Sequence, residues 1–272
     1  MAQWLERGEA RLDEVCPAPQ GTVVVLGSPR SGTSLTAGVL QALGVDMGDI
    51  RPPDSQNPKG YYEDRTFLAL GKLIFQAAEE NASGFNLPDL TAILDQEAKF
   101  RDRICKAVVH RVNAARGSHW GWKTTHTNLT LPLFMPHLDN PKLVIVFRNP
   151  LNTAKSMIKF TTTKSHLYSP LDIEGALKVV HEYYHGINYI IGSYDVPRRF
   201  IAYEELIHEP ESEIRSLCDF LGIRVDRETL AKAMSMVASR SDLRRAHYAL
   251  LIAKSAMRLR KLPGKVLSNI HK

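Results

Sequence analysis

Residues 27–34, GSPRSGTS, could hold a phosphate or sulfate group. The two glycines of this segment, Gly27 and Gly32, allow a backbone that turns successive N–H groups toward one point. The segment also supplies hydroxyl and guanidinium donors, which are Arg30, Ser31, Thr33 and Ser34. Because many donors and no acid stand close together, the segment predicts a loop that binds an oxyanion.

A missing lysine and a missing acid narrow the kinds of ligand that this loop could bind. Enzymes that hydrolyse nucleoside triphosphates place a lysine after the second glycine, where this chain has Thr33. They also hold magnesium with an acid at the end of a second buried strand. Here the apolar run 142–147, KLVIVF, is followed by Arg148. A guanidinium binds phosphate directly, so we expect a site that needs no metal.

The elements that must position these residues alternate between strands and helices. Apolar, β-branched runs predict strands at 22–26, 142–147 and 199–203, and a short one at 120–123. Amphipathic stretches predict helices at about 34–43, 64–80, 91–116, 172–193 and 210–221, and another helix that begins at Pro150. This order predicts an α/β fold of three layers, α/β/α, with a central parallel sheet like that of P-loop nucleoside triphosphatases.

The whole chain is expected to form a single domain, residues 1–272. Residues 1–20 are expected to be an N-terminal helical extension, and residues 246–272 a basic C-terminal helix and tail. The net charge of +6 at pH 7 fits an anionic partner. The N-terminal residues lack an apolar secretory signal, and the three cysteines have no paired spacing. We therefore expect a cytoplasmic protein, in which the basic tail either packs on the domain with its charged face in solvent or makes a peripheral contact with the inner membrane face.

Several segments resemble the sulfotransferases that use 3′-phosphoadenosine 5′-phosphosulfate (PAPS). SPRSGTSL is similar to the loop that holds the 5′-phosphosulfate in that family, and VFRNPLNTAKSM is similar to its 3′-phosphate motif. YEELIHEPESEIRSLCDFLGI, NPKGYYE and WGWKTTHTNLTLPLF resemble stretches of bacterial members. The resemblance covers roughly residues 22–245 and rests on two motifs in the same order with the same connecting strands.

The resemblance implies PAPS as co-substrate, 3′-phosphoadenosine 5′-phosphate (PAP) as product and no metal. It implies that Arg30, Ser31, Gly32, Thr33 and Ser34 hold the 5′-phosphosulfate. It further implies that Arg148 and Ser156 bind the 3′-phosphate and that Tyr203 contacts adenine. Lys123 and Arg30 are expected to be the cations on the leaving phosphate, with Lys59 a weaker candidate.

The general base has two candidates. The family places a glutamate or a histidine after the first helix, where this chain has Glu63, and Asp64 is the nearest rival by position. Animal members use the histidine of a Lys-Thr-His triplet, and this chain has Lys-Thr-Thr-His ending at His126. The bacterial Asp-Pro-Arg that normally follows the lysine is missing here, so the acceptor contacts near 124–126 are open.

The acceptor is expected to be a small molecule or carbohydrate: a sugar, a glycolipid or a small natural product, and no nucleic acid. Loops at 49–61, 81–89 and 160–171 are expected to line its side of the site. Two other functions remain open on the sequence: a nucleotide-dependent kinase of small molecules, and a binding protein without turnover. The sequence predicts no oligomeric state.

Overall fold

The computed structural model describes residues 21–50, 52–53, 60–115 and 119–237. The predicted N-terminal extension, Lys59 and the basic tail lie outside the described residues. No helix in the described ranges is long and apolar enough to cross a membrane.

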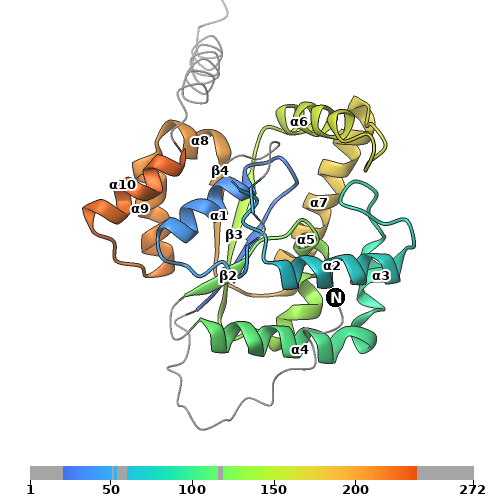
Figure 1. Ribbon diagram of the computed structural model, residues 1–272, viewed down its shortest axis with the longest axis horizontal. Coiled ribbons are helices and arrows are strands. Elements are labelled where there is room, and N and C mark those ends of the chain that lie inside the picture. Colours follow the sequence, from blue (N-terminus) through green and yellow to red (C-terminus); the bar gives the residue numbers. More distant parts are fainter. Residues whose placement is uncertain (1–20, 51, 54–59, 116–118, 238–272) are drawn as a thin grey trace, which may run out of the picture.

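A parallel sheet of four strands forms the centre of the fold (Figure 1). The strands are β1 (Thr22–Leu26), β2 (Trp120–Trp122), β3 (Pro141–Phe147) and β4 (Arg198–Ala202), in the spatial order β2-β1-β3-β4. All three pairings are parallel, with Val23 opposite Gly121 and Val25 opposite Val144. β1 is buried along its whole length, as its continuous β-branched run predicts.

Helices cover both faces of this sheet, which confirms the predicted three-layer α/β/α architecture. The helices are α1 (Thr33–Ala42), α2 (Arg65–Ala78), α3 (Leu90–Leu94), α4 (Glu97–Ala114), α5 (Thr127–Phe134), α6 (Pro150–Thr163), α7 (Ile173–Ser193), α8 (Tyr203–His208), α9 (Pro210–Leu221) and α10 (Arg227–Val237). A short 3-10 helix follows α5 at Met135–His137. One core lies between the sheet and α2, α4, α5 and α7, and another between the sheet and α1, α8, α9 and α10 (Figure 1).

Several predictions of secondary structure were wrong. The helix expected at 91–116 is two helices, because the chain makes a tight turn at Asp95 and Gln96 in which the Gln96 N–H donates to the Ile93 carbonyl. No glycine or proline marks that turn. Helix α5 was not expected, since Pro132 lies inside it. Tyr203, expected at a strand end, is the first residue of α8.

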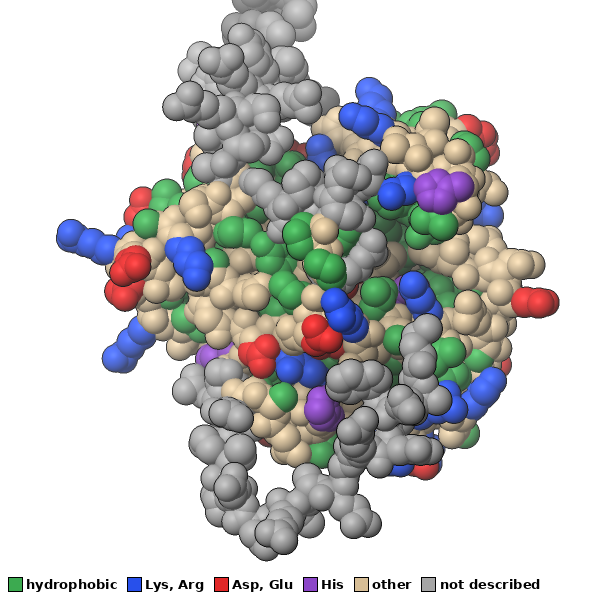
Figure 2. Space-filling view, in the orientation of Figure 1, with side chains coloured by type: hydrophobic (Ala, Val, Ile, Leu, Met, Phe, Trp, Pro, Cys, Tyr) green, Lys and Arg blue, Asp and Glu red, His purple; other side chains and the backbone are tan. Residues whose placement is uncertain are grey.

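Charged side chains of both signs are interspersed over the described part of the face drawn in Figure 2. Exposed pairs such as Arg101–Glu97 and Arg215–Glu211 join charges one helical turn apart. Such exposed pairs add little stability.

Candidate functional site

The loop at 27–34 connects β1 to α1 in a conformation that requires glycine at two positions. Gly27 and Gly32 have φ angles of 150° and 108°. A Cβ atom on Gly32 would lie 2.4 Å from the Tyr203 ring, and one on Gly27 would lie 2.6 Å from the Val146 carbonyl oxygen. Arg30 also has a positive φ, 69°, which costs about 1–2 kcal/mol for a residue with a side chain. Strain of this kind is typical of functional loops.

The N-terminal end of α1 is suited to hold an anion. Gly32 precedes the helix and supplies no side-chain cap, and the first turn contains no acid. The first backbone N–H groups of a helix have no intrahelical acceptor, and the helix dipole places positive charge there. A phosphate or sulfate group therefore fits this end of the helix.

Asn128 of α5 holds the start of this loop, a role that no sequence pattern indicates. Its side-chain Oδ1 accepts from the Gly27 N–H at 2.7 Å, and its Nδ2 donates to the Gly27 carbonyl at 3.1 Å and the Thr125 carbonyl at 2.9 Å. Asn128 is fully buried. A paired interaction of this kind fixes the loop relative to the segment that contains Lys123 and His126.

Residues predicted to bind the two ends of PAPS converge on Arg30. The Arg30 Nε donates to Ser156 Oγ at 3.2 Å, and Arg148 Nη1 donates to the Arg30 carbonyl at 3.2 Å. The Arg148 guanidinium lies 4.4 Å from the centre of the Tyr203 ring. Its buried Nε has no hydrogen-bond partner among the described residues. The structure thus brings the ends of β3, α6 and α8 to the loop.

Two guanidinium groups at one place have an electrostatic consequence. Burial lowers the pKa of Arg30, Tyr61 and Tyr203 raise it, and the neighbouring Arg148 lowers it. An anion placed between the two arginines would relieve their repulsion. The buried Arg148 Nε, which has no partner among the described residues, fits a phosphate-bearing ligand.

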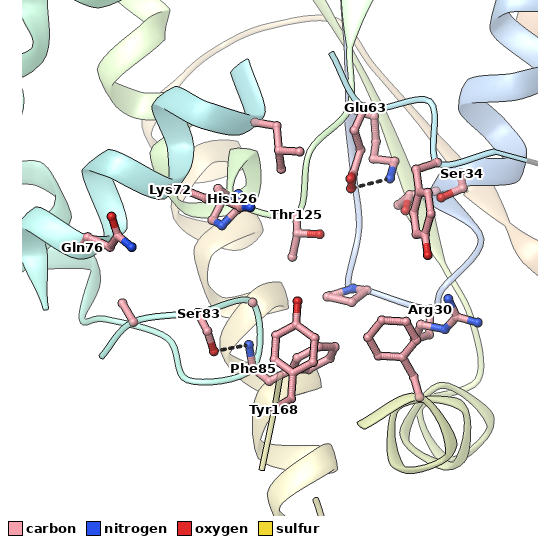
Figure 3. Close-up of a pocket in the computed structure, with 18 residues that line it drawn as sticks. Arg30, Ser34, Glu63, Lys72, Gln76, Ser83, Phe85, Thr125, His126 and Tyr168 are labelled. Atoms are coloured by element: carbon pink, nitrogen blue, oxygen red, sulfur yellow. Dashed lines mark hydrogen bonds and ion pairs between the residues drawn. The ribbon is translucent and has the colours of Figure 1, made fainter. Parts of the chain in front are cut away.

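Glu63 and Lys123 form a buried ion pair next to the loop. Lys123 follows β2 and its Nζ lies 3.0 Å from the Glu63 Oε1, with only 6% and 8% of the two side chains exposed. The aromatic strand Trp120–Trp122, which stacks on Phe67, places Lys123 at the carboxyl end of the sheet. Both residues were predicted for the site, and the structure places their charged groups side by side. Figure 3 labels Glu63 and marks this ion pair with a dashed line.

Asp64, the other acid that could serve as the base, is the N-cap residue of α2. Its Oδ1 accepts from the N–H groups of Thr66 and Phe67 at 2.9 and 3.1 Å, and its Oδ2 accepts from the Asp49 N–H at 3.2 Å. The Arg111 Nε lies 3.6 Å from the same Oδ2. This N-cap role favours Glu63 over Asp64 as the base.

Arg111 is a buried residue that the sequence did not single out. Its Nη2 lies 3.1 Å from Asp46 Oδ1 and donates to the Asp46 carbonyl at 3.2 Å, while its Nε faces Asp64. Asp46 and Asp64 stand at the two ends of the segment that leads to Glu63. One guanidinium from α4 therefore ties both ends of this segment.

His126 lies at the start of α5, buried, with its ring packed edge-on at 4.6 Å against Phe75. Burial lowers its pKa to about 4, with Glu63 raising and Lys72 lowering it. The imidazole is therefore neutral at pH 7. Its Nδ1 has no partner among the described residues, and the ring lines the pocket.

A pocket of about 330 Å³ joins the loop to the predicted acceptor segments (Figure 3). Its lining includes Arg30, Thr33 and Ser34 from the loop, with Glu63, Lys123 and His126 beyond them. The predicted acceptor loops contribute Tyr61, residues 82–85, Phe160 and Tyr168. Within the described ranges no three His, Cys, Asp or Glu side chains gather to hold a metal ion, and metal independence stays a prediction.

The fold is a parallel sheet between two layers of helices, and a glycine-containing loop joins its first strand to the first helix. These features define the class of P-loop-like α/β proteins. The model of the Sulfotransferase family matches residues 22–227. The chain belongs to this family, which confirms the resemblance and supports a transferase activity.

A solved structure supports the fold, and others are similar at lower scores. The chain is similar to the sulfotransferase domain from the curacin biosynthetic pathway, with a TM-score of 0.52 and 17% identity over 84% of this chain and 83% of that one. The sulfotransferase domain of the Synechococcus PCC 7002 olefin synthase matches with a TM-score of 0.49 and 17% identity over 88% and 86% of the two chains. A sulfotransferase from Mycobacterium tuberculosis H37Rv matches with a TM-score of 0.46 and 17% identity over 83% and 74%. No curated protein gave a significant match.

Proposed function

We propose that this protein transfers a sulfuryl group from PAPS to a hydroxyl group of a small-molecule or carbohydrate acceptor. The observation that carries the proposal is the convergence of Arg30, Arg148 and Ser156 beside the glycine loop, with the Glu63–Lys123 pair at the adjoining pocket. Donors for two phosphate groups and an acid–base pair for the acceptor are the parts that sulfuryl transfer needs.

The loop residues Arg30, Ser31, Gly32, Thr33 and Ser34 would hold the 5′-phosphosulfate. Arg148 and Ser156 would bind the 3′-phosphate, and Tyr203, whose ring lies against both Gly32 and Arg148, would contact the adenine. PAPS supplies a sulfuryl group on a phosphate leaving group.

The reaction is an in-line displacement. The acceptor oxygen forms a bond to sulfur as the bond between sulfur and the bridging phosphate oxygen breaks, and PAP leaves with the electron pair. Glu63 takes the proton of the acceptor hydroxyl. Lys123 and Arg30 stabilise the charge that develops on the leaving phosphate.

Glu63 is the preferred base for a geometric reason. It pairs with a buried lysine that also faces the loop, so a proton acceptor and a cation stand at the same side of the reacting bond. His126 remains the second candidate, because its ring lines the same pocket. Its low pKa of about 4 makes it a weak base.

The experiment that tests this function is calorimetry with PAP and with ATP, each with magnesium and with EDTA. We expect micromolar PAP binding that EDTA does not change, and ATP binding weaker by about tenfold or more. Arg148→Gln should weaken PAP binding by about tenfold or more, whereas Arg101→Gln, an exposed arginine of α4, should not. Absent PAP binding, or tight magnesium-dependent ATP binding as a kinase would show, would contradict the proposal.

We further propose a cytoplasmic location, an acceptor that is a sugar, a glycolipid or a small natural product, and no nucleic-acid partner. The interspersed charges of the face in Figure 2 support the last point, since nucleic acid favours a continuous basic surface.

A further inference from the structure

One side of the pocket is a stripe of three residues on α2. Leu68, Lys72 and Gln76 stand four residues apart, so they share one face of the helix, and all three line the pocket. Leu68 is closest along the helix to Glu63. Each step of four residues is about 6 Å, so the ammonium and then the amide lie progressively farther from the reaction centre.

The opposite side of the pocket is aromatic. Phe85, Phe160 and Tyr168 form a cluster in which the Phe85 and Tyr168 rings meet edge to face at 5.0 Å, and Phe160 lies 5.8 and 5.9 Å from the other two. Figure 3 shows Phe85 and Tyr168 across the pocket from Lys72 and Gln76. An apolar ring of a ligand would find its contacts on this side.

The charge of the described pocket lining is positive. Its charged side chains are Arg30, Glu63, Lys72 and Lys123. Glu63 and Lys123 neutralise each other at 3.0 Å, and Arg30 belongs to the nucleotide loop. Lys72 is therefore the one charged group that this lining offers to the far part of an acceptor, and among the described residues no carboxylate pairs with it.

From this arrangement we infer that the acceptor carries an anionic group, a carboxylate or phosphate, which Lys72 binds with help from Gln76. The apolar body of the acceptor packs on Phe85, Phe160 and Tyr168, and its hydroxyl reaches Glu63. Neutral sugars and uncharged phenols are then poor acceptors. This inference rests on the proposed sulfuryl transfer and names the substrate class of the same site.

The test uses three probes with the same hydroxylated ring: 4-hydroxyphenylacetate, its amide, and 4-hydroxybenzylphosphonate. Their Kd values are measured by calorimetry and saturation-transfer NMR on the full chain saturated with PAP. Lys72 is exposed, so we expect each anion to bind about two- to fivefold more tightly than the amide. Lys72→Gln should abolish this preference, Lys72→Glu should reverse it, and Lys72→Arg should keep it.

Two controls separate this inference from the function on which it rests. Lys106→Gln, an exposed lysine of α4 outside the pocket, should leave the preference intact. PAP affinity should be unchanged in all Lys72 variants, because Lys72 faces the acceptor. Loss of PAP binding in the unaltered protein would contradict the proposed function. Three results would overturn the anionic acceptor alone, provided that PAP binds normally. These are equal affinity for the three probes, no binding of any probe, and a preference for the anions that survives Lys72→Gln.

Discussion

At the scale of single residues, the proposed chemistry depends on the buried Glu63–Lys123 pair. A carboxylate beside the site of an incoming anion opposes nucleotide binding, whereas the same carboxylate helps the acceptor lose its proton. Removing the charge of Glu63 should therefore strengthen nucleotide binding and slow turnover.

Glu63→Gln is expected to reduce kcat by about a hundredfold or more, the usual contribution of a general base. PAP should bind the variant at least as tightly as the unaltered protein, since Lys123 then lacks its anionic partner. Turnover is measured as PAP released from PAPS with an acceptor found by mass-spectrometric screening, and affinity by calorimetry.

Two variants serve as comparisons for this result. Glu97→Gln changes an exposed acid of α4 and should alter neither quantity. His126→Ala should reduce kcat less than Glu63→Gln does. If Glu63→Gln keeps more than a tenth of the activity, or if His126→Ala is the more damaging change, Glu63 is not the base.

At the scale of elements, the candidate site depends on how closely α8 and α5 approach the β1–α1 loop. Gly32 touches the Tyr203 ring of α8, and Asn128 of α5 bonds both polar groups of Gly27. Neither contact is visible in the local pattern of the loop.

Gly32→Ala is expected to abolish PAP binding, because the new Cβ would overlap the Tyr203 ring. Gly44→Ala is the matched control: Gly44 also has a positive φ, 93°, but nothing lies within 4 Å of its added Cβ. Both variants suffer the backbone strain of about 1–2 kcal/mol, and only Gly32→Ala suffers the collision. Calorimetry with PAP distinguishes them, and equal affinity in the two variants would show that the close approach is unimportant.

Asn128→Ala is expected to lower the free energy of unfolding by about 2–4 kcal/mol, because it leaves the polar groups of Gly27 buried and unpaired. It should also weaken PAP binding, although Asn128 lies behind the loop. Denaturant unfolding and calorimetry measure the two effects. Asn152→Ala, at an exposed position of α6, is the control and should change neither. Unchanged PAP affinity in a destabilised Asn128→Ala protein would refute a positioning role.

At the scale of the whole molecule, the buried His126 links stability to pH. Its pKa is about 4 in the folded protein and about 6.5 when exposed in the unfolded chain. Between these values the unfolded state binds a proton that the folded state does not, so stability is full above pH 6.5 and is lost as the pH falls toward 4.

From pH 7 to pH 4.5, His126 should account for a loss of about 2–3 kcal/mol in the free energy of unfolding. His126→Gln should remove this part of the pH dependence, while other titrating groups contribute equally to both proteins. Urea unfolding of both proteins at the two pH values gives the difference directly. Parallel pH profiles would mean that His126 is not held neutral by burial.

The sequence by itself determined the three-layer fold and the location of the anion loop, because both depend on local patterns. The β-branched runs at 22–26 and 142–147 correspond to β1 and β3 to within one residue. Glycines and hydroxyl residues between a strand and a helix are typical of an anion-binding loop. The sequence also indicated that Arg148 would meet the loop, since parallel strands end at one edge of the sheet.

Only the tertiary structure decided which polar residues serve the site and which serve the scaffold. Glu63 and Asp64 are adjacent acids, yet one faces Lys123 and the other caps α2 and faces Arg111. Asn128 and Arg111 contact segments that lie far away in sequence, and no local pattern distinguishes them from surface residues. Their roles come from packing, which brings distant side chains within hydrogen-bond distance and removes the water that would otherwise satisfy them.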